Sequence, residues 1–169
     1  MRFYRKGKFM KMNSIMAAAV SATIVALAGV SAAEAQNWQA NPNYGSVSLR
    51  TGFTPDPYVV NVMSGGTINA AGIGGSCRGF ISNAPDFDLY FTGGSSLPLL
   101  ISVASNADTT LVVRAPDGLW YCDDDSGQGL NPAVRFNNPR SGLYDIWVGT
   151  YGNASNQPSQ INISELYSQ

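Results

Sequence analysis

Carboxylates are the side chains of this sequence whose type and spacing most directly suggest chemistry. Seven aspartates fall between residues 86 and 125, and six of them could act as ligands: Asp86, Asp88, Asp108, Asp123, Asp124 and Asp125. Calcium takes several oxygen ligands from carboxylates and loop carbonyls, so these aspartates form a candidate calcium site. Their spacing is not that of an EF-hand loop. Aspartates also bond their own backbone in tight turns, and we favour that role. Calcium is the alternative, and no cofactor is required.

A serine nucleophile is suggested by the triplet Asp125-Ser126-Gly127, which resembles that of chymotrypsin-like proteases. Such a serine needs a base to take its proton, usually histidine. The chain has no histidine, and its three lysines all precede residue 12, in a segment that we expect to be removed. A glycosidase-type carboxylate pair, such as Asp86 with Asp88, stays formally open but has no support from spacing. We therefore predict a protein without catalytic residues.

Aromatic side chains are the second kind of candidate site. Trp120, Trp147 and Tyr151 lie in or beside predicted strands. Alternation along its strand places Trp147 on the face opposite Tyr144 and Val148. An exposed row of these aromatics could stack on sugar rings or contact a protein partner. The alternative, which we favour, is a second packing layer or cover for a strand edge.

The N-terminal residues 1–35 have the pattern of a cleavable signal peptide. A basic start precedes an apolar run from Ile15 to Val30, and Ala33-Glu34-Ala35 is a small-x-small cleavage site. The apolar run is shorter than the ~20 residues of a membrane-spanning helix. We predict cleavage after Ala35, no transmembrane segment in the remaining chain, and a secreted or periplasmic protein.

The charge of residues 36–169 excludes some partners. Five arginines face nine aspartates and Glu165, a net charge of −5. A nucleic-acid or anionic-membrane partner would require a basic patch. We therefore expect a protein or glycan partner and no nucleic acid.

The elements that position these side chains are predicted to be β-strands. Apolar residues come in short runs between turn residues, and Phe87, Leu89 and Phe91 alternate with polar or outward positions. The clearest hairpin joins Thr109–Ala115 to Leu119–Cys122 through Pro116-Asp117-Gly118. Roughly nine or ten such strands predict one all-β domain over residues 36–169, a two-sheet, jelly-roll-like sandwich.

Two cysteines, Cys77 and Cys122, remain after the predicted cleavage. In an oxidising compartment an even pair predicts a disulfide. Two free thiols or half of a metal site are the alternatives. A zinc site would need further cysteine or histidine ligands, which this chain lacks.

A family resemblance rests on five short motifs in order. They are Asp86–Tyr90, Asp108–Val113, Pro116–Gly118, Asp123–Asp125 and Gly142–Gly149. Together, over residues 86–151, they resemble the bacterial pre-peptidase C-terminal domain family, secreted β-sandwich modules often appended to proteases. The cysteine pair is not part of the family's general pattern. The resemblance implies a non-catalytic, jelly-roll-like sandwich and transfers no partner.

These observations predict an exported, non-catalytic module for protein interaction or envelope and extracellular assembly. One alternative is a carbohydrate-binding module that uses exposed aromatics such as Trp120 and Trp147. A second alternative is a hydrolase-associated domain that has no active site of its own.

Overall fold

The computed structural model describes Met1 and residues 36–94, 96–153 and 155–169. The predicted signal peptide therefore lies almost wholly outside the described residues. Within the described part of the chain, no helix is long and apolar enough to cross a membrane.

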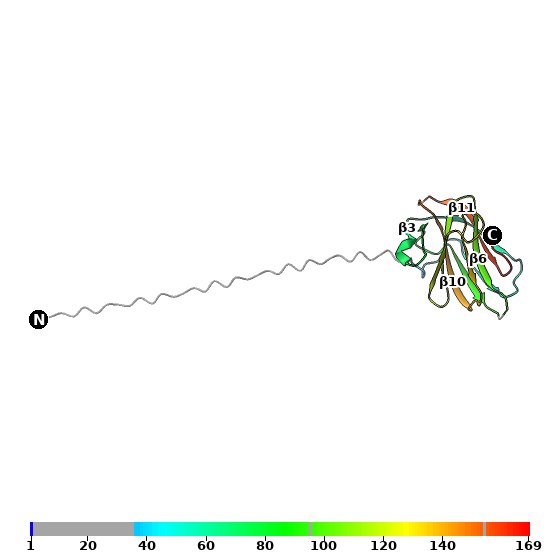
Figure 1. Ribbon diagram of the computed structural model, residues 1–169. Helices are drawn as coiled ribbons and strands as arrows, with labels where there is room; N and C mark the ends of the chain where they lie inside the picture. Colours follow the sequence, from blue (N-terminus) through cyan, green and yellow to red (C-terminus); the bar gives the residue numbers. More distant parts are fainter. Residues whose placement is uncertain (2–35, 95, 154) are drawn as a thin grey trace. The chain divides into compact units, whose positions relative to one another are not determined.

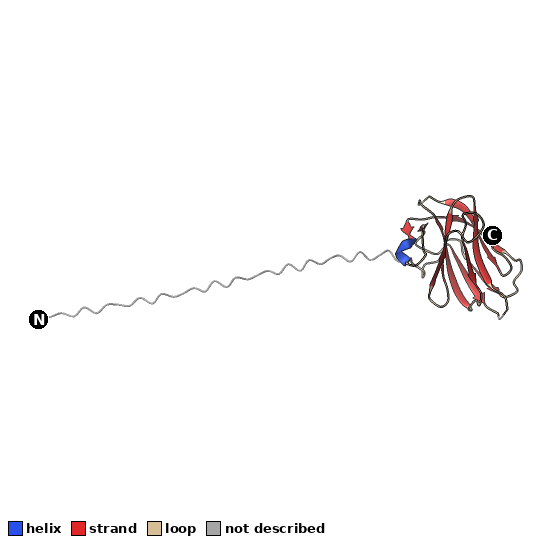
Figure 2. Cartoon of the chain, in the orientation of Figure 1, coloured by secondary structure: helices blue, strands red, loops and turns tan. Residues whose placement is uncertain are grey.

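The described residues form an all-β structure with one short 3₁₀ helix (Figure 2). The strands are β1 (Ser46–Arg50), β2 (Tyr58–Ser64), β3 (Ile68–Asn69), β4 (Phe80–Ile81), β5 (Phe87–Thr92), β6 (Leu99–Ser105), β7 (Thr109–Arg114), β8 (Trp120–Asp123), β9 (Ala133–Phe136), β10 (Gly142–Thr150) and β11 (Gln157–Ser164). The helix, η1, spans Ala70–Ile73. The described residues hold eleven strands where the sequence predicted nine or ten, and β3 and β4 are only two residues long.

The strands form two sheets, as predicted. The seven-stranded sheet runs β1-β5-β10-β4-β3, and β7 pairs with both β10 and β8. The four-stranded sheet runs β2-β11-β6-β9, and its two central strands, β11 and β6, are labelled in Figure 1. All ladders are antiparallel except that of β1 with β5. The predicted hairpin is confirmed as β7 and β8, with Arg114 opposite Trp120.

The main core lies between the two sheets and follows the predicted alternation. Leu89 on β5, Ile146 on β10 and Ile101 on β6 are each completely buried. Each of them points from its own sheet toward the opposite sheet and belongs to one buried cluster. The residues beside them in sequence point to the outer faces, since side chains in a strand alternate. The inward positions of β5 and β10 therefore match the sequence prediction.

A second, smaller core covers the outer face of the seven-stranded sheet. Trp147 and Val112 project from β10 and β7, and Ile68, Ala70 and Ile81 lie against them. The segment from β3 to β4 thus forms a lid over this face. Gly149 lets the lid approach closely, since a Cβ there would collide with Thr110 and Ile81.

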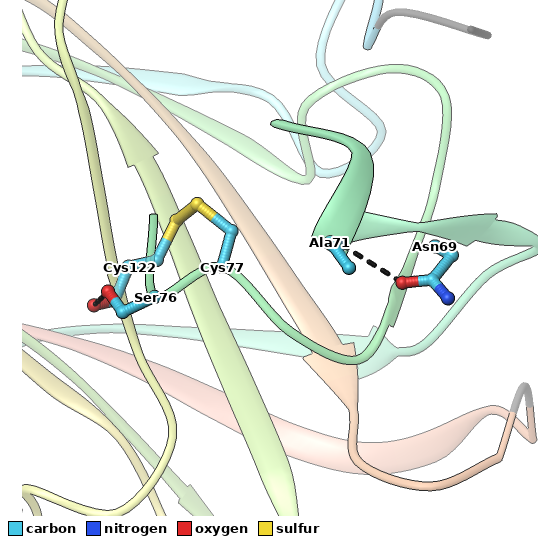
Figure 3. Close-up of a disulfide and its surroundings, with 5 residues drawn as sticks. All are labelled: Asn69, Ala71, Ser76, Cys77 and Cys122. Carbon is cyan, nitrogen blue, oxygen red and sulfur yellow. Dashed lines mark hydrogen bonds between the residues drawn. A yellow bond between two sulfur atoms is a disulfide. The ribbon is translucent and has the colours of Figure 1, made fainter. Parts of the chain in front are cut away.

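The disulfide Cys77–Cys122 is present and attaches the lid to β8 (Figure 3). Beside it, the Ser76 hydroxyl donates to the Cys122 carbonyl at 2.9 Å. The Asn69 side chain accepts from the Ala71 N–H at 3.0 Å and so begins η1. The predicted cysteine pairing is confirmed, and its position shows that the bond anchors the second core.

Candidate functional site

Asp86 is a structural carboxylate that completes the seven-stranded sheet. Between β5 and β4 the edge of β10 has no strand partner at Val148, and the Asp86 carboxylate accepts that N–H at 2.8 Å. The Asn43 side-chain amide donates to its other oxygen at 3.2 Å. Burial raises the pKa of Asp86 to about 6, against the opposing effect of these hydrogen bonds. Its oxygens are thus occupied by protein donors.

Asp88 lies opposite Asp145 across the β5–β10 ladder, on the outer face of the sheet. The Asp145 carboxylate is 3.4 Å from the Arg114 guanidinium, which lies 3.8 Å above the ring of Trp38. Burial, and next the charge of Asp145, raise the pKa of Asp88 to about 6. Burial also raises the pKa of Asp145, while Arg114 opposes that rise. This corner of the sheet therefore holds two carboxylates that favour protonation.

These raised pKa values predict a stability that falls as the pH rises from about 4 to 6. In that range the folded state binds more protons than the unfolded state, whose aspartates have pKa values near 3.8. Each shift from 3.8 to about 6 lowers the free energy of unfolding by about 3 kcal/mol once the pH is above both values. Urea denaturation at several pH values measures the slope.

An Asp88→Asn variant separates the effect of Asp88 on the pH dependence of stability from that of Asp86. Removing the charge that faces Asp145 is expected to raise the free energy of unfolding at pH 7 by about 1–2 kcal/mol. The variant should also show a shallower dependence on pH between 4 and 6. Equal slopes for the variant and the wild type would contradict the assignment to Asp88.

The acidic loop uses its first two aspartates for structure. Asp123 accepts from the Ser126 N–H at 2.8 Å, the Ser126 hydroxyl at 2.7 Å and the Ala133 N–H at 2.9 Å. Asp124 lies 3.5 Å from the guanidinium of Arg78. The Ser126 hydroxyl thus donates to a turn carboxylate, an arrangement typical of loop closure.

The six predicted calcium ligands divide into separate groups. Asp86 and Asp88 belong to the seven-stranded sheet, and Asp123 closes its own loop. Burial raises the pKa of Asp108, and the charges of Asp125 and Asp124 add to the rise, so these three lie within electrostatic reach. In the described part of the chain, no three Asp, Glu, Cys or His side chains come together as a metal-binding group.

The structure contradicts an exposed aromatic surface at Trp147, because this side chain belongs to the second core. Trp147 does face away from the main core, but the lid covers it and its exposure is 0%. The half-buried Trp120 packs against it, with ring centroids 5.5 Å apart. Tyr151 is exposed but follows the end of β10, where its N–H donates to the Asp108 carbonyl. Trp147 therefore cannot belong to a binding surface, and the packing alternative describes it.

A groove lies on the outer face of the four-stranded sheet, with a volume of about 660 Å³. Its floor consists of two cross-strand rows. One row is Asn61, Gln160 and Ala104, from β2, β11 and β6, and the other pairs Met63 with Pro158. The groove thus crosses three strands that are far apart in sequence.

The walls of this groove are held by hydrogen bonds. On one side the Tyr44 hydroxyl accepts from the Met63 N–H at 3.0 Å. On the other side the Gln169 N–H donates to the Ser102 hydroxyl at 3.0 Å, and the Gln128 N–H donates to the Gln169 carbonyl. Asn131 braces this wall by donating to the Ser105 carbonyl at 2.9 Å. Internal hydrogen bonds therefore fix both walls of the groove.

None of the side chains that line the groove is charged. Met63, Ala104 and Pro158 offer apolar contacts, and Tyr44 offers a half-exposed ring. The amides of Asn61 and Gln160 bond one another at 2.9 Å and keep further donors and acceptors available. Such a surface suits an uncharged ligand with many hydrogen-bonding groups.

Three solved structures are similar to this chain at the level of fold. The pre-peptidase C-terminal domain of a collagenase from Bacillus anthracis has 13% identity and a TM-score of 0.42, covering 74% of this chain and 99% of that one. PliG of Aeromonas hydrophila, a periplasmic inhibitor of g-type lysozyme, has 12% identity and a TM-score of 0.39, covering 74% of this chain and 98% of that one. PliG of Salmonella Typhimurium has 12% identity and a TM-score of 0.34, covering 69% of this chain and 96% of that one. No family model matches the chain, and no curated protein matches it.

Sequence reasoning did not identify the groove, although one signal was present. The alternation that places Val62, Val103 and Ile161 in the core also places their neighbours on the outer face. These neighbours include Met63 and Ala104, which are apolar where an outward position is usually polar. Which strands lie side by side, and hence which neighbours meet, is decided only by the fold.

Proposed function

We propose that this chain is an exported, non-catalytic binding module that recognises a segment of a partner protein in the groove of its four-stranded sheet. The observation that carries the proposal is the groove itself, whose lining side chains are uncharged and whose floor combines apolar side chains with the amides of Asn61 and Gln160. Ligand sites are commonly concave, with a few polar groups that fix orientation.

The groove residues favour a polypeptide over a charged small molecule. Protein interfaces are depleted of charged side chains at their centre and enriched in tyrosine and methionine, and Tyr44 and Met63 line this groove. The Asn61 and Gln160 amides can pair with the N–H and C=O groups of a peptide backbone. Met63, Pro158 and Ala104 provide contact for its apolar side chains.

Export is supported by two independent features. The Cys77–Cys122 disulfide is of a kind that persists in oxidising compartments such as the periplasm or the cell exterior. The N-terminal residues have the composition of a signal peptide. A partner is therefore expected in the cell envelope or outside the cell.

A glycan is the second candidate ligand, favoured by Tyr44. Its ring is half-exposed at the groove wall, and its hydroxyl is held by the Met63 N–H. An aromatic face beside amide groups is a surface on which a sugar ring can stack. This version depends on Tyr44, whereas the peptide version depends mainly on the groove floor.

An Ala104→Arg variant tests the groove directly. Ala104 lies in the floor, so the arginine side chain would fill the space that a ligand needs, while Ser48→Arg on the exposed face of β1 serves as control. Peptides selected from a displayed random library on the wild type should bind Ala104→Arg at least ~10-fold more weakly by calorimetry. They should bind Ser48→Arg unchanged.

The two ligand classes give different outcomes in parallel assays. Peptides that bind the wild type and Ala104→Arg equally would contradict the proposed groove. Enrichment on a glycan array, lost in a Tyr44→Ala variant, together with no selected peptide, would replace the protein partner with a carbohydrate.

A further inference from the structure

β2 is an edge strand of the four-stranded sheet and pairs only with β11 in the described part of the chain. Its seven residues, Tyr58–Ser64, include no charged residue, no proline and no glycine. Natural proteins usually protect such edges with lysine, proline or a bulge. The outer edge of β2 is therefore open to pairing with another strand.

The free backbone groups of this edge are confined to two residues. The Met63 N–H points away from β11, since it donates to Tyr44, and it faces Pro158, which has no N–H. Antiparallel pairing alternates by two residues, so Val59 and Asn61 also direct their N–H and C=O groups outward. No described residue bonds these four groups. Tyr44 limits the free edge at one end and Pro57 limits it at the other.

The same edge leaves part of the main core incompletely covered. Tyr58 and Val60 point inward from β2, and Val47 and Leu49 point inward from β1, yet all four are only half-buried. Val59 on the outer face is 44% exposed. A strand added beside β2 would bury apolar surface as well as satisfy backbone groups.

We propose that β2 pairs antiparallel with β2 of a second copy of this chain, with the twofold axis between the two Val60 residues. In this register Val59 of each copy exchanges both backbone hydrogen bonds with Asn61 of the other. The outward groups of Val59 and Asn61 are all used, and no further donor is needed from Pro57 or Met63. The free N–H and C=O groups of one β2 edge can therefore all pair with those of a second copy.

Charge also favours a second copy at this edge. Residues 36–169 carry a net charge of −5, so two copies repel wherever their acids meet. β2 has no charge, and Asp56 at its start is occupied by the Ser164 hydroxyl and the Glu165 N–H. The two Val60 side chains, opposed in a non-hydrogen-bonded pair, would cover each other's exposed surface.

The dimer would join two four-stranded sheets into one sheet of eight strands. A twofold axis perpendicular to the sheet places both grooves on the same side, next to each other across the β2 pair. This inference does not depend on the groove binding a ligand, because it uses the strand edge alone.

A Val59→Pro variant tests the pairing. The Val59 N–H has no partner within the described chain, so proline removes two intermolecular donors per dimer and no bond of the monomer. Sedimentation of the purified wild type should give a dimer, and the variant's dissociation constant should rise at least ~100-fold. Ser48→Pro, on the edge strand β1, should leave the dimer intact. A wild type that stays monomeric up to about 1 mM would overturn the proposal.

Cysteine cross-linking tests the register, and it remains informative if Val59→Pro fails to fold. At the twofold axis the two Val60 Cα atoms would be ~4.5 Å apart, within the range of a disulfide. A Val60→Cys variant should form a cross-linked dimer on a non-reducing gel, whereas Val59→Cys should not. Efficient cross-linking through Val59→Cys, or none through Val60→Cys, would overturn this register.

Discussion

Removal of the disulfide in a Cys77→Ala/Cys122→Ala double variant is expected to lower the free energy of unfolding by about 4 kcal/mol. The bond joins residues 45 positions apart, and an open loop of that length gains conformational entropy when the chain unfolds. Alanine avoids placing a hydroxyl in the second core, where Cys77 is 4% exposed. Urea denaturation followed by tryptophan fluorescence measures the change.

The wild type under reducing conditions provides the control for this prediction. It should approach the stability of the double variant, and the variant itself should not respond to the reductant. The lid should also exchange its amide hydrogens faster, because its attachment to β8 is lost. A loss of less than about 1 kcal/mol would contradict a stabilising role for this cross-link.

Truncation of Trp147 to alanine is expected to cost about 3–5 kcal/mol of unfolding free energy. This side chain is completely buried between β10 and the lid, against Trp120. Its removal would leave a cavity that the disulfide-anchored lid can fill only in part. The Trp147 N–H has no hydrogen-bond partner among the described residues, so the indole contributes through packing.

A Trp147→Phe variant separates packing from any role in binding. Phenylalanine keeps part of the buried volume and removes the unpaired N–H, so its cost should be smaller, about 1–2 kcal/mol. Both variants, assayed while folded, should bind groove-selected peptides like the wild type, because Trp147 lies on the other sheet. A Trp147→Ala change of stability within about 0.5 kcal/mol would contradict the packing role.

The role of the aspartates could not be decided from residue type alone. Asp86, Asp88 and Asp123 are equally suited by type to calcium binding or to turns. In the fold, Asp86 takes the place of a strand partner for Val148, and Asp123 closes the loop that follows β8. Both roles depend on donors from Val148 and Ala133, which no spacing rule connects to those aspartates.

Local pattern was sufficient for the strands of the main core and for the central hairpin. Alternation identified the inward faces of β5 and β10, because successive side chains in a strand point to opposite faces. The Pro116-Asp117-Gly118 turn identified the pairing of β7 with β8 for a related reason, since short turns join neighbouring antiparallel strands. Two cysteines allowed only one intramolecular pair.

The sequence by itself thus determined the fold class, the inward faces and the disulfide, all of which follow from short-range periodicity or simple counting. Only the tertiary structure decided that a lid covers Trp147, that β2 is left at an edge, and that Tyr44, Met63, Ala104 and Pro158 meet in one groove. The reason is physical. Periodicity says which face of a strand is apolar, but what covers that face depends on segments brought together from distant parts of the chain.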